Sequence, residues 1–184
     1  MPRSRCNTFF AILLLIAFAL PAFAQTSTPS SVWNSLVDDF LDRELFPNSP
    51  TLATQIGVHD FDVKLEDLSR NGIERHIAGL KKFEARTVAL DPKGLSQMET
   101  ADREMLLSAI RSELLSLQVI RTWEKDPDTY SAGAANSIYV IMSRNFASPD
   151  DRLRSVAARE KQFPQYFAAA RAEKYSEDLY RDSA

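Results

Sequence analysis

Hydrophobic side chains recur every three or four residues along most of the chain, which is the spacing of amphipathic α-helices. The first stripe covers residues 32–45, where charged residues occupy most other positions. Ser30 or Ser31 is expected to cap this helix, because a short polar side chain satisfies the free amides of a first turn. A short second helix is expected to begin after Ser49 and to end at Gly57, a common residue at helix C-termini.

The middle of the chain carries equally clear start and stop signals. Ser69 is expected to cap a helix that ends at the Asp-Pro pair of residues 91–92. Ser96 and Glu99 match a capping box, which opens a long helix running towards Trp123. The apolar stripes of these two helices are interpreted as core, and they contain Ile73, Ile77, Leu80, Phe83, Val88, Met98, Met105, Leu106, Ile110, Leu114 and Leu117.

The last part of the chain continues this organisation. Residues 134–142 are expected to be helical, and Ser148 with Pro149 opens a further helix through Arg159. A Phe-Pro pair precedes a last helix over residues 165–174. No segment shows the sustained alternation typical of strands. The sequence therefore predicts an all-α partial domain of about six to seven helices.

The first 24 residues have the features of a cleaved secretory signal peptide. Arg3 and Arg5 form a positive start, residues 9–20 are apolar, and the small-x-small pattern at residues 22–24 predicts cleavage after Ala24. A membrane anchor is the alternative, but about 12 apolar residues are too few to span a bilayer. We therefore expect a periplasmic or secreted protein with no stable membrane anchor after cleavage.

Composition narrows the expectations for the mature chain. Cys6 is the only cysteine and is lost with residues 1–24, so disulfides are excluded and packing must supply the stability. Loss of the two arginines moves the net charge from −3 to −5, and this mildly acidic balance argues against a nucleic-acid partner. Residues 25–31, rich in Ser, Thr and Pro, are interpreted as a flexible leader.

One segment carries a family resemblance. Residues 49–62 read Ser-Pro-Thr-Leu-Ala-Thr-Gln-Ile-Gly-Val-His-Asp-Phe-Asp. This segment resembles the opening signature of the bacterial domain-of-unknown-function 885 family, in which a Ser/Thr-Pro-x-x-Ala-x-x-x-Gly-x-His-Asp stretch lies between two helices. The likeness continues over residues 32–172, and its later elements are the Asp-Pro pairs at 91–92 and 126–127, Arg144 with Phe146, and the run from Pro149 to Pro164.

The resemblance implies a zinc-dependent function whose metal-binding motif does not occur in this sequence. Family members are expected to hydrolyse peptides with a zinc ion held by a His-Glu-x-x-His motif in their C-terminal half, with helices such as these walling part of the cleft. The chain has two histidines, His59 and His76, and neither begins such a motif. We therefore expect no complete zinc site and no hydrolysis by this chain alone; zinc and a peptide substrate belong to the full-length protein. A different metal site, built from both histidines and carboxylates, is an alternative.

The tail departs from the family pattern. Residues 173–184 read Glu-Lys-Tyr-Ser-Glu-Asp-Leu-Tyr-Arg-Asp-Ser-Ala, where family members continue with a Pro-containing segment and an Ile-Tyr-Thr-Glu-like helix. With suitable codons, a shift of one nucleotide turns this tail into Arg-Asn-Ile-Pro-Arg-Ile-Tyr-Thr-Glu-Ile-Ala. Our hypothesis is that a frameshift truncated the reading frame, and the gene sequence tests it.

His59 and Asp60 are the accessory catalytic candidates of the signature. Asp60 could orient the His59 imidazole, as carboxylates do beside metal-bound histidines. We favour the plainer interpretation, in which both residues belong to a turn, because no nucleophile or metal ligand is adjacent in the sequence. His76 is expected on a solvated helix face, and Asp38 and Asp42, one turn apart, are expected to be solvated as well.

A group of arginines in the C-terminal part could grip a substrate carboxylate, since a guanidinium offers a fixed fork of donors. Ion pairs with the acidic residues around them are expected instead. The arginines are Arg144, Arg152, Arg154 and Arg159, and the acidic residues are Asp150, Asp151 and Glu160.

Three hypotheses for the function follow. The first is the exported N-terminal helical region of a family protein, without catalysis of its own. The second is a free-standing periplasmic helical module that binds a partner, and the third is a small enzyme with a non-zinc site at His59 and Asp60. The first predicts a large apolar surface left open where the missing half would dock, whereas an independent module closes its core.

Overall fold

The computed structural model describes residues 28–172, and helices make up most of this range. The predicted signal peptide, most of the predicted leader and the tail at 173–184 lie outside the described residues. No β-strand occurs among residues 28–172, which confirms the all-α class. Within the same range no helix has the length and apolarity that a membrane crossing requires.

The elements follow one another with short connections. Those of the N-terminal half are α1 (Pro29–Phe40), the π-helical turn η1 (Leu41–Leu45), α2 (Phe46–Asn48), α3 (Pro50–Ile56), the 3₁₀ turn η2 (His59–Phe61) and α4 (Arg70–Ala89). Those of the C-terminal half are α5 (Gln97–Leu115), the π-helical turn η3 (Ser116–Ile120), α6 (Thr122–Lys125), α7 (Asp128–Met142), α8 (Pro149–Glu160) and α9 (Phe163–Ala172).

The predicted caps of three helices are confirmed. The side chain of Ser69 accepts a hydrogen bond from the backbone at the start of α4, and that of Ser148 does so at the start of α8. Ser96 and Glu99 form the reciprocal capping box of α5, with distances of 3.2 Å and 2.7 Å. These side chains satisfy amides that have no partner within the helix, which fixes where each helix begins.

The start of α1 differs from the prediction. The helix begins at Pro29, and its N-cap is Thr28, whose hydroxyl accepts a bond from Ser31 N (3.2 Å). Proline is favoured in a first helical turn because it has no amide hydrogen to leave unpaired. Residues 29–31 therefore form the first turn of α1 rather than the end of a leader, and neither Ser30 nor Ser31 is the cap.

Three other boundaries also differ from the prediction. The long helix that begins with α5 ends at Ile120, because Arg121 adopts a left-handed conformation (φ 57°), and Trp123 lies in the separate helix α6. α7 begins at Asp128 rather than at residue 134, and its first turns bury one large side chain, Tyr130, among small and polar residues. α9 begins at Phe163, because a proline in the first turn does not interrupt a helix.

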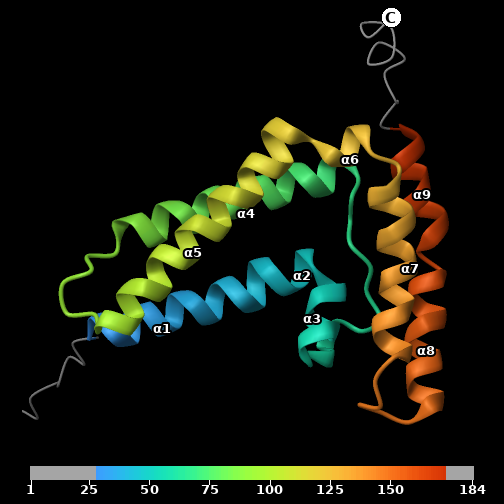
Figure 1. Cartoon of the computed structure of the whole chain (residues 1–184), viewed down its shortest axis with the longest axis horizontal. Helices are drawn as coiled ribbons and strands as arrows, with labels where there is room; N and C mark the ends of the chain where they lie inside the picture. Colours follow the sequence, from blue (N-terminus) through green and yellow to red (C-terminus); the bar gives the residue numbers. More distant parts are fainter. Residues whose placement is uncertain (1–27, 173–184) are drawn as a thin grey trace, which may run out of the picture.

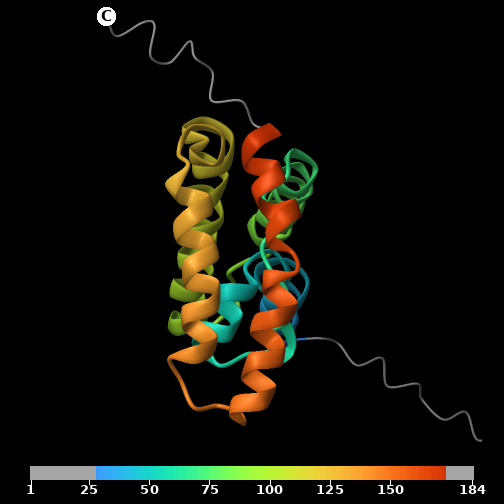
Figure 2. The same cartoon turned by 90° about the vertical axis from the view of Figure 1, so that its right-hand side faces the viewer.

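The helices form two groups that α3 joins (Figures 1 and 2). In the first group, α4 and α5 form an antiparallel pair, and α1 packs beside α4. In the second group, α8 and α9 follow one another and run antiparallel to α7. α3 packs against α7, and the segment from η2 to α4 runs along the same side. The signature at residues 49–62 therefore lies where the two groups meet.

Each group has its own apolar core. The larger core lies between α1, α4 and α5 and consists of Phe40, Ile73, Leu80, Phe83, Ile110, Leu114, Leu117 and Trp123. Two smaller ones belong to the second group and consist of Leu65, Tyr130, Ala134 and Tyr166, and of Val140, Ile141 and Val156.

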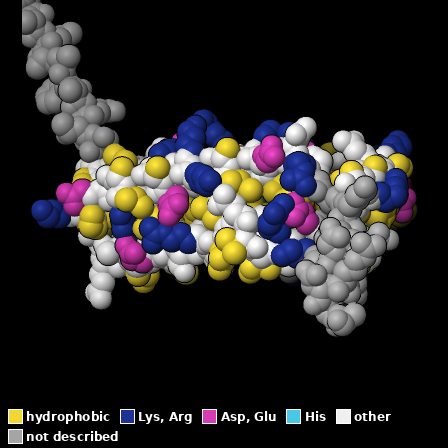
Figure 3. Space-filling view, turned by 90° about the horizontal axis from the view of Figure 1, so that it is seen from above, with side chains coloured by type: hydrophobic (Ala, Val, Ile, Leu, Met, Phe, Trp, Pro, Cys, Tyr) yellow, Lys and Arg dark blue, Asp and Glu magenta, His cyan; other side chains and the backbone are white. Residues whose placement is uncertain are grey.

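The core interpretation fails for three residues of the predicted stripes. Met98 and Met105 are 71% and 67% exposed, and Val88 is 52% exposed. α5 packs on α4 through one side, so the methionine side of α5 faces solvent. Figure 3 shows hydrophobic side chains at the surface among charged ones, viewed from above.

Gly57 ends α3 in a left-handed conformation (φ 94°), which lets its amide bond the carbonyl of Thr54 (3.2 Å) and turns the chain into η2. No other atom lies within 4 Å of where a Cβ would sit, so the requirement for glycine is conformational and not steric.

We expect Gly57→Ala to lower the free energy of unfolding by about 1 kcal/mol, the cost of an L-residue in this conformation. Gly57→Asn should lose less, since asparagine tolerates the left-handed region. Urea unfolding followed by circular dichroism measures both. Equal losses would show that the conformation of residue 57 is not what limits substitution there.

Candidate functional site

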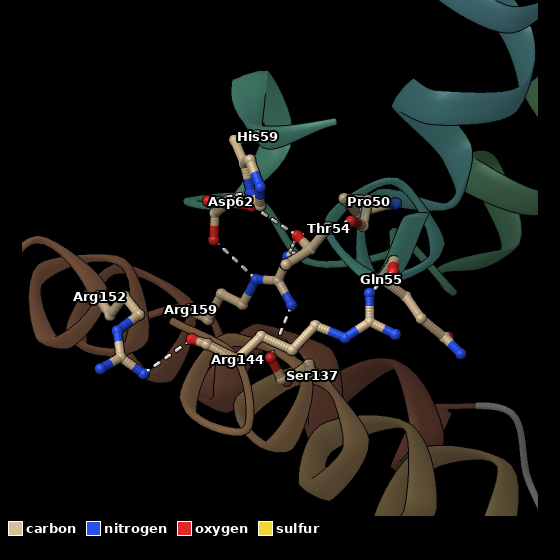
Figure 4. Close-up of polar contacts among 9 residues, drawn as sticks. All are labelled: Pro50, Thr54, Gln55, His59, Asp62, Ser137, Arg144, Arg152 and Arg159. Carbon is tan, nitrogen blue, oxygen red and sulfur yellow. Dashed lines mark hydrogen bonds and ion pairs between the residues drawn. The ribbon is translucent and has the colours of Figure 1, made fainter. Parts of the chain in front are cut away.

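Arg159 of α8 is completely buried between α3, α7 and the segment after η2 (Figure 4). Its five N–H groups have five acceptors, three carbonyl oxygens and two hydroxyls, which are Asp62 O (2.8 Å), Ser137 O (2.7 Å), Pro50 O (3.4 Å), Thr51 Oγ1 (3.4 Å) and Thr54 Oγ1 (2.8 Å). The guanidinium is thus fully satisfied without a direct ion pair. One side chain joins α8 to α7, α3 and the end of the signature.

Two carboxylates balance this buried charge through threonine hydroxyls. Thr54 Oγ1 accepts from Arg159 and donates to Asp62 Oδ1 (2.6 Å). Thr51 Oγ1 accepts from Arg159 and donates to Glu66 Oε2 (3.0 Å), while Thr51 N donates to Glu66 Oε1 (2.9 Å). Burial lowers the pKa of Arg159, and the charges of Glu66 and Asp62 oppose that shift. Because arginine remains protonated in proteins, the cluster is a buried cation with an anion on each side.

The same network orients His59. Its Nδ1 lies 3.1 Å from Asp62 Oδ2, and its ring stacks on Phe146 with centroids 3.8 Å apart and planes at 13°. The side chain is 37% exposed, and no partner for Nε2 is found among residues 28–172. With Nδ1–H bound to a carboxylate, the neutral imidazole offers the lone pair of Nε2 to solvent.

The carboxylate that orients His59 is Asp62 and not Asp60, which corrects the pairing suggested by the sequence. Both histidine and aspartate candidates lie at the 3₁₀ turn η2, where side chains three residues apart share one side of the turn. Asp60 is exposed there, in the first position after His59. The interpretation favoured from the sequence, that His59 and Asp60 belong to a turn, agrees with η2, and the alternative of an oriented histidine named the wrong carboxylate.

The other arginines mostly bind carbonyl oxygens, contrary to the predicted ion pairs. Arg144 donates to Gln55 O in the last turn of α3 (2.5 Å), and Arg152 donates to two carbonyl oxygens at the end of α7 (3.0 and 2.9 Å). Helix C-termini leave such oxygens without partners, and a cation there is favourable. The expected pairing with a neighbouring acid is confirmed for Arg154, which pairs with Asp151.

His76 is not on a solvated face, in contrast to the prediction. Its side chain is 12% exposed, Nδ1 lies 2.8 Å from Glu44 Oε1, and Nε2 lies 3.8 Å from Glu113 Oε1. Burial disfavours the charged imidazole, but the carboxylates of Glu113 and Glu44 outweigh it and raise the pKa of His76 to about 9. A Cβ at Gly79 would overlap the Glu44 carboxylate, so glycine lets this carboxylate lie close against α4. The group ties α4 to η1 and α5.

The described residues do not fit a zinc site of the peptidase type. His59 and His76 lie on different elements and each has its own carboxylate partner. Across residues 28–172 no group of three His, Cys, Asp or Glu side chains could hold a metal ion, whereas a protein zinc site needs at least three such ligands. Asp38 and Asp42 are both exposed, as predicted.

A second surface feature is an apolar groove between α1 and α5, which we call the α1–α5 groove. It has a volume of about 650 Å³, and its apolar lining consists of Trp33, Val37, Phe40 and Leu41 from α1 and η1, with Met105, Leu106 and Ala109 from α5. Both helices pack against α4, and the groove lies between them.

The fold and the network define the class of protein: an all-α chain whose signature segment is held by a buried arginine. A family model described as "Bacterial protein of unknown function (DUF885)" matches residues 50–177, most of the chain, and the protein belongs to this family. The match begins at the first residue of α3 and confirms the resemblance of the signature. No curated protein and no solved structure matches the chain.

The sequence did not predict that Arg159, Thr54 and Asp62 form one hydrogen-bond network. One pattern on α8 indicated that Arg159 is buried. Arg152, Val156 and Arg159 share one face of α8, since they are spaced by four and three residues. All three are buried. Arginines in line with an apolar position indicate buried cations rather than solvated ones.

We expect Arg159→Met to lower the free energy of unfolding by about 3–5 kcal/mol, because it leaves buried acceptors and two carboxylates without their cation. Arg154→Met on the exposed side of the same helix should change it by less than about 0.5 kcal/mol. Arg159→Lys, with the charge but fewer donors, should fall between them. Urea unfolding of the three variants measures this order, and similar values for Arg159→Met and Arg154→Met would contradict it.

The stability of the protein should depend on pH through His76. Its pKa is raised from 6.5 to about 9 on folding, so the stabilisation is complete below pH 6.5 and is lost as the pH rises through 9. The loss is expected to be on the order of 1–2 kcal/mol. Unfolding free energies of the wild type and His76→Gln, measured on both sides of that interval, should converge at the alkaline end. A constant difference would contradict the assignment.

Proposed function

We propose that this protein is the exported N-terminal helical region of a zinc-dependent, peptide-hydrolysing DUF885 protein, and that it presents His59 to a cleft completed by further polypeptide. On this proposal the zinc ion and a His-Glu-x-x-His motif belong to polypeptide outside these 184 residues, and the chain by itself hydrolyses nothing. The supporting observation is the way in which the family segment is built around one imidazole.

Three side chains in series hold that imidazole. Arg159 binds Thr54, Thr54 binds Asp62, and Asp62 binds Nδ1 of His59, with three distances of 2.8, 2.6 and 3.1 Å. The ring is further fixed by the face of Phe146. Burying a cation and a carboxylate to hold a half-exposed histidine costs stability, which supports a role for its free nitrogen beyond packing.

The chemistry available to His59 is that of an oriented acceptor. Its Nε2 can accept a hydrogen bond from a peptide N–H or from water, while Asp62 holds the ring through Nδ1. Among the described residues, the contacts found for His59 are with Asp62 and Phe146 and include no nucleophile. No group of described side chains could hold the zinc ion. We therefore assign His59 an accessory role towards a substrate and no complete reaction.

Export is tested by the mature N-terminus. The proposal expects the protein in the periplasmic or extracellular fraction with Gln25 as its first residue, measured by mass spectrometry of the purified protein. An intact N-terminus in the cytoplasmic fraction would remove export from the proposal.

Catalysis is tested by reconstitution. The DNA that follows the reading frame is translated in all three frames, and a polypeptide with the His-Glu-x-x-His motif is produced together with this chain. We expect zinc-dependent hydrolysis of a fluorogenic peptide mixture by the pair and none by the chain alone. His59→Asn should lower kcat of the pair by about tenfold or more, and the adjacent exposed variant Asp60→Asn should leave it unchanged.

Three results would contradict the proposal. One is the absence of the motif from every downstream frame. Another is hydrolysis by the chain alone that His59→Asn abolishes, which would make the protein a small enzyme. The third is an equal effect of His59→Asn and Asp60→Asn on the pair, which would remove the role of the oriented imidazole.

A free-standing helical binding module is the second candidate function, and in that case the α1–α5 groove would be the surface that binds the partner. An apolar groove of about 650 Å³ with exposed methionines beside it is larger than scattered surface residues explain. An open apolar groove is the result expected from the first proposal, in which further polypeptide covers it, whereas an independent module is expected to close its core. The reconstitution experiment distinguishes the two candidate functions, because only the first predicts peptide hydrolysis by the reconstituted pair.

A further inference from the structure

The α1–α5 groove lies at a position where a further helix could pack beside α1 and α5. α1 and α5 each pack on α4, and the floor between them is made by Trp33 and Phe40, which are 4% and 7% exposed. Met105 of α5 lines the opposite side of the groove and is 67% exposed. A helix laid between α1 and α5 would complete a four-helix arrangement, because it would find an apolar side on both neighbours.

The groove is also acidic at its edges. Asp38 lines it from α1 and Asp102 from α5, and no lysine or arginine is among the described residues that line it. Neither carboxylate has an ion pair among residues 28–172. A ligand that covers the groove must therefore approach two uncompensated negative charges, one on each side.

The negative charges of Asp38 and Asp102 restrict which molecules can bind in the groove. A second copy placed groove to groove would bring Asp38 and Asp102 towards the same residues of its partner, which is repulsive at the edge of a desolvated interface. An anionic lipid surface is repelled for the same reason. The favoured occupant is apolar on one face and basic at its sides.

We infer that the α1–α5 groove binds an amphipathic α-helix of a partner polypeptide, with an apolar stripe towards Trp33 and Met105 and lysine or arginine flanks towards Asp38 and Asp102. The lining of α5 from Asp102 to Ala109, extended by Met98, spans about 16 Å at 1.5 Å per residue, which matches about three helical turns. Anchors at the i, i+3, i+4 and i+7 positions fill such a groove. The flexible methionine side chains adapt to the anchors.

This inference rests on the groove alone and not on the proposed catalysis, since His59 is not among the residues that line the groove. The test uses a fluorescein-labelled peptide of about 14 residues with leucine at the helical anchor positions and lysine at the others, and a second peptide with glutamate in place of lysine. Binding to the purified protein is followed by fluorescence anisotropy at several salt concentrations.

We expect the lysine peptide to bind, with an affinity that falls as salt rises, and the glutamate peptide to bind at least about tenfold more weakly. Met105→Lys should weaken the lysine peptide by about tenfold or more, because it places a like charge in the groove. Leu153→Lys is the matched control: it adds the same charge at a 52% exposed position of α8 and should leave the affinity unchanged.

The inference is overturned if the lysine peptide fails to bind, if both peptides bind alike, or if Met105→Lys and Leu153→Lys weaken binding equally. It is overturned in favour of a second copy if light scattering shows a dimer that Met105→Lys dissociates. Asp102→Asn provides a further check, since it should reduce both the affinity for the lysine peptide and its dependence on salt.

Discussion

A buried positive charge on α8 is the constraint on which the junction of the two helix groups depends. The guanidinium of Arg159 is removed from water, so each of its N–H groups must find an acceptor and its charge must be balanced nearby. The acceptors come from α3, α7 and the end of the signature, and the balancing carboxylates are reached through two threonine hydroxyls. Because one planar group satisfies all these conditions together, the position of α3 on α7 is specified more narrowly than apolar packing alone would require.

The two histidines show how differently carboxylates act in this fold. His76 is enclosed between Glu44 and Glu113, and its role is to hold α4 against the neighbouring elements as a charged group. His59 has one carboxylate partner and one aromatic neighbour, and its Nε2 has no partner among residues 28–172. The apolar α1–α5 groove is a separate opening on the first helix group. The described residues thus include a partly exposed histidine at the junction and an apolar groove on the first group.

Sequence patterns predicted the local structure well and the polar interior poorly. The caps at Ser69, Ser96 and Ser148 and the stop at Gly57 involve residues within a few positions of one another, so short-range rules locate them. The partners of Arg159 and His76 lie tens of residues away, and only the tertiary arrangement brings them together. For the same reason Met98 and Met105 keep a helical spacing but not a buried environment, since the pattern does not say which side of α5 has a neighbour. The family signature located the segment at the junction of the two helix groups. It did not indicate that Arg159 of α8, which also binds Ser137 of α7, holds this segment.

The central claim is that Arg159 holds the signature segment in place, and amide hydrogen exchange of the Arg159→Lys variant tests it most directly. Lysine keeps the charge but cannot reach all five acceptors. The account predicts faster exchange in α3 and in residues 57–66, with exchange in α4 and α5 unchanged from the wild type. Exchange that rises equally in every helix, or that does not rise in α3, would contradict it.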